Sequence, residues 1–99
     1  MLSVKTNQDI LLEIAERVKE RRLEMNLTQT GLAKRSGCTL GTYRRFEQTG
    51  EISLSNLVKI AFAIRCEEDF DLLFSKKKYA SIDELLQDNT EKRKRGRKS

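Results

Sequence analysis

Histidine, proline and tryptophan are absent from this 99-residue chain, and cysteine occurs only twice. Without histidine the sequence lacks the usual general base, the partner of Ser and Cys nucleophiles, and the commonest metal ligand. Cys38 and Cys66 are too few for a four-ligand zinc site or a disulfide framework, so we expect small buried hydrophobic residues in a reducing compartment. We therefore expect no enzyme, no catalytic residue, no metal and no cofactor.

Long apolar stretches are also missing. Residues 1–10 hold one lysine and no apolar run, which is unlike a signal peptide. No segment approaches the ~18 consecutive apolar residues that a membrane span requires. The length suits one small domain. Together these features predict a soluble, cytoplasmic protein.

The net charge of +5 lies entirely at the C-terminal end of the chain. Residues 1–74 carry 11 basic and 11 acidic side chains, whereas residues 75–99 carry 9 basic and 4 acidic ones, and six of those nine lie within 92–99. The composition therefore predicts an N-terminal segment over 1–8, a folded domain over 9–74 and a basic C-terminal extension that we expect to be largely disordered.

Apolar residues at helical spacing, separated by capping residues, predict an all-α fold. Five helices are expected, at residues 9–24, 29–36, 40–48, 54–64 and 67–74. The expected N-caps are Asn7, Thr28, Thr39 and Ser53. Further along the chain, residues 81–86 are typical of one or two helical turns with a capping box between Ser81 and Glu84.

The fourth predicted helix has the widest apolar face and should be central. That face contains Leu54, Leu57, Val58, Ile60, Ala61 and Ile64. The fifth predicted helix should bury Phe70, Leu73 and Phe74. Phe62 lies off the main apolar stripe, where it is either a dimer contact or a partly buried residue.

The second and third predicted helices, with a tight glycine turn between them, fit a helix-turn-helix motif. Ala33 is the small residue that such a motif needs where its two helices cross. Gly37 can adopt the left-handed conformation of the turn. Tyr43 and Phe46, three residues apart, are expected to anchor the third helix in the core.

With these residues the chain resembles the lambda-repressor/Cro-like, or XRE, family of DNA-binding regulators. The matching residues are Leu27-Thr28-Gln29, Leu32-Ala33-Lys34, Gly37, Thr39, Tyr43-Arg44-Arg45-Phe46-Glu47, Gly50, Ser53-Leu54 and Leu57-Val58-Lys59-Ile60-Ala61. Two positions depart from the family pattern, because Gly31 stands where Glu is usual and Tyr43 replaces Ile or Val. Gly31 should weaken its helix by up to ~1 kcal/mol relative to Ala.

The resemblance implies that the second helix of the motif lies in the major groove and that the N-terminus of the first crosses a phosphate. The base-reading candidates are Thr39, Leu40, Gly41, Arg44 and Arg45. The phosphate candidates are Gln29, Lys34 and Gln48, with Arg44 in a second, shared role. Arg45 is the strongest candidate for base reading, because an Arg fork can bond guanine O6 and N7 together.

The family resemblance also implies a sequence-specific transcriptional regulator, namely a homodimeric repressor that binds a palindromic operator in double-stranded DNA of the bacterial nucleoid. Residues 81–86 and the basic end that follows resemble the C-terminus of HipB-like antitoxins. Those proteins neutralise a HipA-type kinase toxin and autoregulate their operon, which is the alternative function. An RNA-binding adaptor is a third hypothesis, which the lack of exposed stacking aromatics disfavours.

The basic tail, with Arg93, Arg95 and Arg97, has three possible roles. As a charged end it can aid solubility. As a DNA arm it can contact phosphates and insert arginines into the minor groove, since Arg-Gly-Arg is similar to part of an AT-hook. As a partner contact it can bind a toxin. The sequence alone leaves these three roles open.

Overall fold

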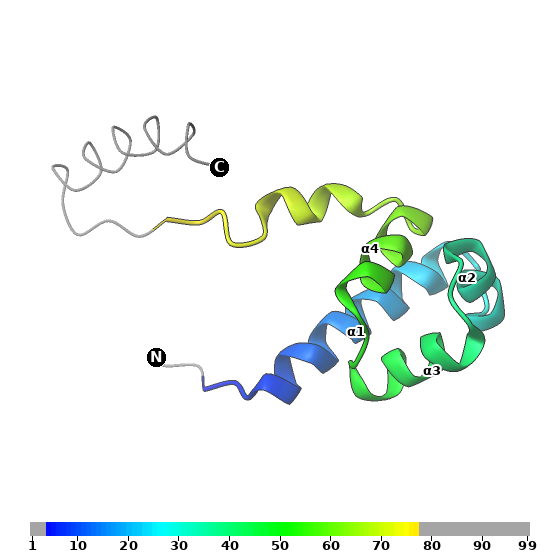
Figure 1. Ribbon diagram of the computed structural model, residues 1–99, viewed down its shortest axis with the longest axis horizontal. Helices are drawn as coiled ribbons and strands as arrows, with labels where there is room; N and C mark the ends of the chain where they lie inside the picture. Colours follow the sequence, from blue (N-terminus) through cyan, green and yellow to red (C-terminus); the bar gives the residue numbers. More distant parts are fainter. Residues whose placement is uncertain (1–3, 78–99) are drawn as a thin grey trace, which may run out of the picture.

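The computed structural model describes residues 4–77, and in this range the fold consists of helices without a strand (Figure 1). The helices are α1 (Asn7–Glu24), α2 (Gln29–Ser36), α3 (Leu40–Thr49), α4 (Leu54–Ala63) and a 3-10 helix, η1 (Glu67–Leu72). This confirms the all-α prediction. The predicted turns at 81–86 and the basic tail lie outside the described residues.

Each α-helix begins after a hydroxyl residue whose side chain accepts a backbone N–H three positions later. For α2, α3 and α4 these are the predicted caps. For α1 the predicted cap, Asn7, is wrong. Thr6 accepts the Asp9 N–H at 3.0 Å and the Asp9 carboxylate accepts the Thr6 N–H at 3.0 Å, so a reciprocal capping box starts the helix two residues earlier than predicted.

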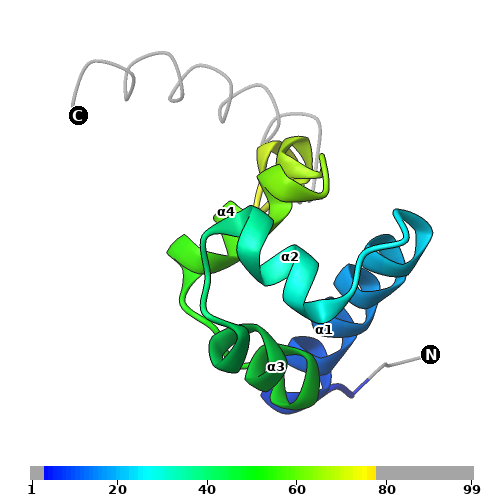
Figure 2. The same cartoon turned by 90° about the vertical axis from the view of Figure 1, so that its right-hand side faces the viewer.

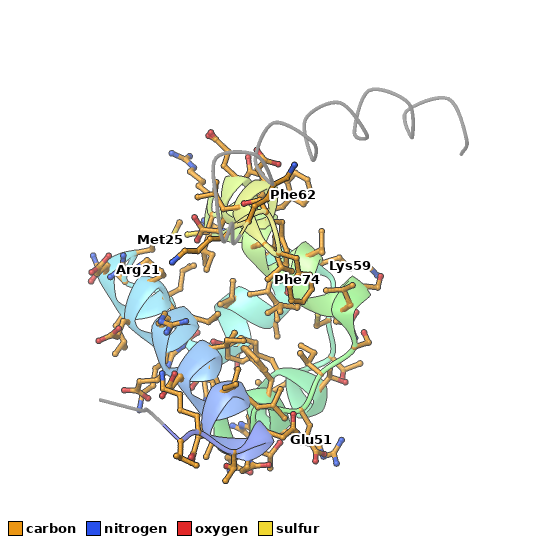
Figure 3. The ribbon with its side chains drawn as sticks, turned by 90° about the vertical axis from the view of Figure 1, so that its left-hand side faces the viewer. Arg21, Met25, Glu51, Lys59, Phe62 and Phe74 are labelled. Atoms are coloured by element: carbon orange, nitrogen blue, oxygen red, sulfur yellow. The ribbon has the colours of Figure 1, made fainter. Side chains whose placement is uncertain are left out.

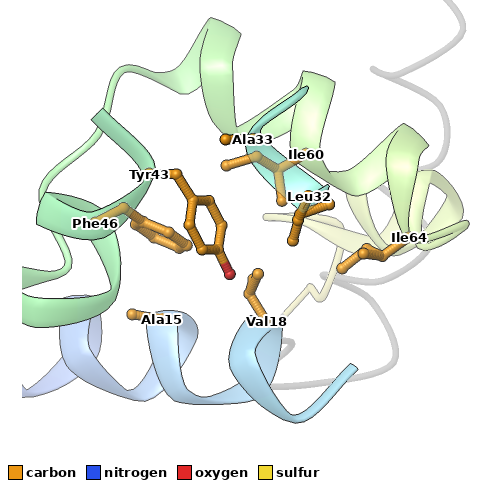
Figure 4. Packing of buried hydrophobic residues seen from close by; sticks show 8 residues of the cluster. All are labelled: Ala15, Val18, Leu32, Ala33, Tyr43, Phe46, Ile60 and Ile64. Atoms are coloured by element: carbon orange, nitrogen blue, oxygen red, sulfur yellow. The ribbon is translucent and has the colours of Figure 1, made fainter. Parts of the chain in front are cut away.

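The core forms where α1, α2, α3 and α4 meet (Figure 4). Its largest fully buried side chains are Tyr43, Phe46, Leu32 and Ile60. The rings of Tyr43 and Phe46 pack edge to face, with centroids 6.1 Å apart. Ala33 is buried as well, at 3 % exposure. The prediction that Tyr43 and Phe46 anchor α3 in the core is therefore confirmed.

The predicted fifth helix is present, but it is shorter than expected and its geometry and burial differ from the prediction. The segment is a 3-10 helix that packs against α4 and has no side-chain N-cap bond. Phe70 is half-buried, Leu73 is 51 % exposed and Phe74 is 95 % exposed. The helix ends at Leu72, and Leu73 has an extended backbone. Phe74 therefore does not continue the helix and is not buried as predicted.

Two large apolar residues of α4 are also exposed to solvent. Leu54, at the first position of the helix, is 65 % exposed, so its predicted place in the buried face is wrong. Phe62 is 61 % exposed, which agrees with its position off the apolar stripe and disfavours simple partial burial (Figure 3).

Candidate DNA-binding surface

The turn between α2 and α3 has the geometry that its sequence predicted (Figure 2). Gly37 has a φ of 82°, in the left-handed region, and the following Cys38 N–H donates to the Ala33 carbonyl at 2.9 Å. Thr39 then caps α3 by accepting the Thr42 N–H at 3.1 Å. The two helices are thus held at a fixed angle by one glycine and one cap.

The outer face of α3 is polar and basic. Five residues on this face are exposed, namely Thr39, Gly41, Arg44, Arg45 and Gln48. Leu40 differs from them, because it is half-buried and packs against the core. Lys34 is exposed near the end of α2. The structure therefore brings most of the predicted site residues to one accessible face of the motif.

Behind this face lies a buried polar group that the sequence did not reveal, which we call the Glu47 cluster: Arg22, Gln29, Tyr43 and Glu47. Arg22 donates from Nε to Glu47 Oε2 at 2.8 Å and from Nη2 to Oε1 at 3.3 Å. Gln29 Nε2 donates to Oε1 at 2.8 Å, and the Tyr43 hydroxyl donates to Oε2. One carboxylate therefore ties α3 to the last turn of α1 and the first residue of α2.

The charges in the Glu47 cluster stabilise one another. Burial alone would raise the pKa of Glu47, but hydrogen bonds from Arg22, Tyr43 and Gln29 lower it below its ordinary value. The bond to Glu47 raises the pKa of Arg22. Burial, followed by the bond to Glu47, raises the pKa of Tyr43. At neutral pH the cluster thus holds an ionised carboxylate, a guanidinium cation and a protonated phenol.

This pairing changes the charge balance of the motif. In sequence terms, residues 28–50 carry four basic residues against Glu47, a local charge of +3. The Glu47 side chain is only 6 % exposed and is compensated by Arg22, which lies outside that range. The four basic residues of 28–50 are therefore not opposed by Glu47, and the carboxylate that pairs with Arg45 is that of Glu51, just beyond this range.

A family model described as helix-turn-helix matches residues 18–70, more than half of the chain. The chain belongs to the XRE-type helix-turn-helix family. Members of this family are DNA-binding transcriptional regulators, and the domain is not usually an enzyme. A search of curated proteins found no match. In this helix-turn-helix regulator α2 and α3 are the two helices of the motif, and α3, as the second of them, is the candidate recognition helix.

Gln29 stands at the N-terminus of the first motif helix, and its side chain already has a partner. One N–H of its amide donates to Glu47, and an amide nitrogen carries a second N–H. A phosphate contact from Gln29 is compatible with the bond to Glu47. The bond to Glu47 also fixes the orientation of the Gln29 amide.

Arg45 on α3 forms an ion pair with Glu51, which follows Gly50 at the C-terminal end of this helix. The two side chains are 66 % and 48 % exposed. The Thr49 hydroxyl stabilises the turn that brings Glu51 back to Arg45. It accepts the Glu51 N–H at 3.1 Å and donates to the Arg45 carbonyl at 2.7 Å. An exposed pair of this kind is worth little, about 0–1 kcal/mol, so a base or phosphate can displace Glu51 from Arg45.

The remaining sequence predictions concern metals, membranes and the tail. Among residues 4–77 no cluster of His, Cys, Asp and Glu is suited to a metal ion, and no helix there is long and apolar enough to span a membrane. Cys38 and Cys66 are half-buried free thiols that pack against the core of the helix-turn-helix domain. The tail arginines Arg93, Arg95 and Arg97 lie outside the described residues.

Proposed function

We propose that this helix-turn-helix regulator is a dimeric repressor that inserts α3 into the major groove of a palindromic operator. The observation that supports it is the division of α3 into two faces. Tyr43 and Phe46 are fixed in the core at 0 % and 1 % exposure, while Arg44 and Arg45 on the same helix are exposed. A rigid helix with exposed arginines fits the geometry of major-groove reading.

The residues of the surface take two roles in this proposal. The base-reading set is Thr39, Leu40, Gly41, Arg44 and Arg45. The set that contacts phosphates is Gln29, Lys34 and Gln48. Leu40 contributes least to base reading, because it is half-buried against the core and offers only part of its side chain to a thymine methyl group. Gly41 has no side chain to read a base, and its role is to let the backbone of α3 approach the DNA closely.

Dimerisation follows from the small footprint of one recognition helix. A single helix reads only a few base pairs, whereas two helices related by a two-fold axis read half-sites about 34 Å apart on one face of the duplex. Binding to a single operator with two protein chains per duplex is the expected stoichiometry. Loss of transcription from a reporter that carries this operator is the expected direction of regulation.

The test of base reading is Arg45→Ala, compared with Arg17→Ala. The two arginines are matched, because their side chains are 66 % and 69 % exposed and each lies in a surface ion pair. Arg45→Ala should lower affinity for the operator by about 1–3 kcal/mol and relax the preference at one position of each half-site. Arg17→Ala should leave both unchanged. Binding to a randomised DNA library measures the preferences.

A preferred sequence that is identical in wild type and Arg45→Ala would contradict the base-reading role of this residue. A uniform loss of affinity for all sequences would instead move Arg45 to the phosphate-contacting set. In either case Thr39 and Arg44 would become the residues to test next.

The second candidate function is that of a HipB-like antitoxin that neutralises a HipA-type kinase toxin and autoregulates its operon. The feature that favours it is the sequence of residues 81–86 followed by the Arg-Gly-Arg end. In this case the product of the adjacent gene should be a kinase-like protein that co-purifies with the full chain. If the neighbouring gene is of another kind and no protein co-purifies, the antitoxin function is contradicted and the repressor function remains.

A further inference from the structure

The ion pair of Arg45 and Glu51 joins the strongest base-reading candidate to a residue that lies outside α3. Thr49 sets the position of Glu51, because its hydroxyl donates to the Arg45 carbonyl and accepts the Glu51 N–H. The carbonyl of Thr49 in turn accepts a hydrogen bond from Gln8 Nε2 at 2.7 Å, which ties this turn to α1. The Glu51 carboxylate is therefore held beside the Arg45 guanidinium by the backbone of the turn as well as by charge.

The contact with Glu51 leaves part of the Arg45 guanidinium free. A guanidinium carries its N–H groups in a planar fork with two edges of paired donors, one formed by Nε and Nη2 and the other by Nη1 and Nη2. Glu51 accepts a hydrogen bond from Nη2 of Arg45. Whichever N–H of Nη2 forms this bond, the second N–H of the same nitrogen belongs to the other edge. One complete edge of Arg45 therefore remains available for O6 and N7 of a guanine.

The Glu51 carboxylate acts differently on the two DNA groups that Arg45 can meet. A guanine edge is uncharged, so it can bind the free edge of the guanidinium while Glu51 keeps its own bond. A phosphate carries a full negative charge, so it is repelled by Glu51 and competes with it for the same guanidinium. Arg44, the neighbouring arginine of α3, forms no ion pair within residues 4–77, and its charge stays available to phosphates. Glu51 thus favours guanine over phosphate at Arg45.

We propose that Glu51 is a positioning residue for base reading, which orients the fork of Arg45 toward a guanine and opposes its use as a phosphate contact. This role rests on the base reading by Arg45 proposed above, and it adds the residue that makes this arginine selective. Glu51 is itself an anion beside DNA, so it does not increase the overall affinity. Its effect falls on the ratio between the affinity for the operator and the affinity for unrelated DNA.

The test compares Glu51→Ala with the matched control Glu24→Ala in the full chain. Both variants remove one exposed carboxylate that pairs with an arginine, but the partner of Glu24, Arg21, lies far from Glu51 (Figure 3). Binding is measured to a randomised DNA library, to the operator and to an unrelated duplex. Glu51→Ala should weaken the preference for guanine at the position read by Arg45. It should also lower the ratio of operator to unrelated affinity up to about fivefold more than Glu24→Ala does, as expected for one exposed ion pair.

A double variant shows whether Glu51 acts through Arg45. In a chain that already carries Arg45→Ala, adding Glu51→Ala should not change the base preferences further. If it does change them, the proposal is overturned, because Glu51 then contacts a base itself. Preferences that change in Arg45→Ala but not in Glu51→Ala would overturn the role of Glu51 alone and leave base reading by Arg45 intact. Preferences that change in neither variant would refute base reading by Arg45 and the role of Glu51 together.

Discussion

Glu47 accepts hydrogen bonds from side chains of α1, α2 and α3, and this makes it the main polar contact between the two motif helices and the rest of the domain. Its pair with Arg22 is buried, at 8 % and 6 % side-chain exposure. Arg22 also donates from Nη1 to the Leu27 carbonyl at 2.8 Å, which fixes the loop before α2. The orientation of α3 therefore depends on a buried ion pair whose polar groups all have partners.

Replacing Arg22 by Met should lower the free energy of unfolding by about 3–5 kcal/mol, because the Glu47 carboxylate would stay buried without its cation. The matched control is Arg21→Met on the same helix. Arg21 pairs with Glu24 at 2.8 Å on the surface, where loss of the pair costs about 1 kcal/mol at most. Urea unfolding measures both. Equal losses in the two variants would show that the buried pair of Arg22 and Glu47 contributes no more to stability than an exposed ion pair does.

The lowered pKa of Glu47 also predicts a loss of stability in acid. The unfolded carboxyl takes up its proton near pH 4.3, and the folded one only at lower pH. The stabilisation by Glu47 is therefore complete above about pH 4.3 and disappears as the pH falls through the folded pKa. In urea unfolding over a pH series, the difference between wild type and Glu47→Gln should shrink in acid.

The control for this pH dependence is Glu16→Gln, on the exposed side of α1. It should unfold nearly like the wild type at each pH. A gap between wild type and Glu47→Gln that stays constant down to acid pH would mean that Glu47 contributes through shape rather than through its charge.

At the scale of residues, the burial of the two core anchors of α3 could be predicted, but the polar partners of Tyr43 could not. Tyr43 and Phe46 were predicted as core anchors from their spacing alone, and both are buried. The Glu47 cluster could not be found in the same way, because Arg22 and Glu47 stand 25 positions apart and come together only when α1 packs on α3. Tyr43 in place of the usual Ile or Val was the available signal, since its hydroxyl needs a buried acceptor.

At the scale of elements, two glycines end the motif helices with similar backbones and different surroundings. Gly37 has a φ of 82° with nothing within 4 Å of an added Cβ. Gly50 has a φ of 81°, but an added Cβ would lie 2.6 Å from the backbone of Leu11. Gly50 thus permits close approach of α3 to α1, in addition to the left-handed turn.

We expect Gly37→Ala to cost about 1–2 kcal/mol of stability, which is the strain of a left-handed alanine. Gly50→Ala should cost more by at least about 1 kcal/mol, because Leu11 and the start of α1 must move. Thermal and urea unfolding of both variants measure the difference. If the two variants were destabilised equally, the packing of α1 on the end of α3 would have to be looser than the distances indicate.

The helices whose limits were predicted best have local signals at their ends. Thr28, Thr39 and Ser53 each bond an N–H only three residues away, so the sequence alone contains the pattern. The segment 67–74 has no such cap, and it packs against α4, which lies earlier in the chain. For that reason the sequence predicted a helix there correctly but not its 3-10 geometry or its exposed Phe74.

At the scale of the whole molecule, charge is unevenly distributed although residues 1–74 are neutral in sum. Arg44 and Arg45 are exposed on α3, whereas Glu67, Glu68 and Asp71 line the pocket between α4 and η1 together with Phe62. Phe62 lies far from Glu51, the partner of Arg45 (Figure 3). Such a distribution favours approach to DNA with the basic end first. Total charge was thus a poor guide to the binding face, and position on the fold a better one.

The contribution of the basic tail to DNA binding can be measured by deleting residues 90–99. This removes six basic residues and one acidic residue and leaves the described domain intact. If the tail binds phosphates, the dependence of log affinity on log salt should become shallower by roughly 0.9 for each phosphate that the tail neutralises, while the preferred sequence stays the same. A full-length chain with Gln at the six basic positions separates charge from length and should behave like the deletion. An unchanged salt slope in both chains would exclude the DNA arm and leave the tail to a protein partner or to solubility.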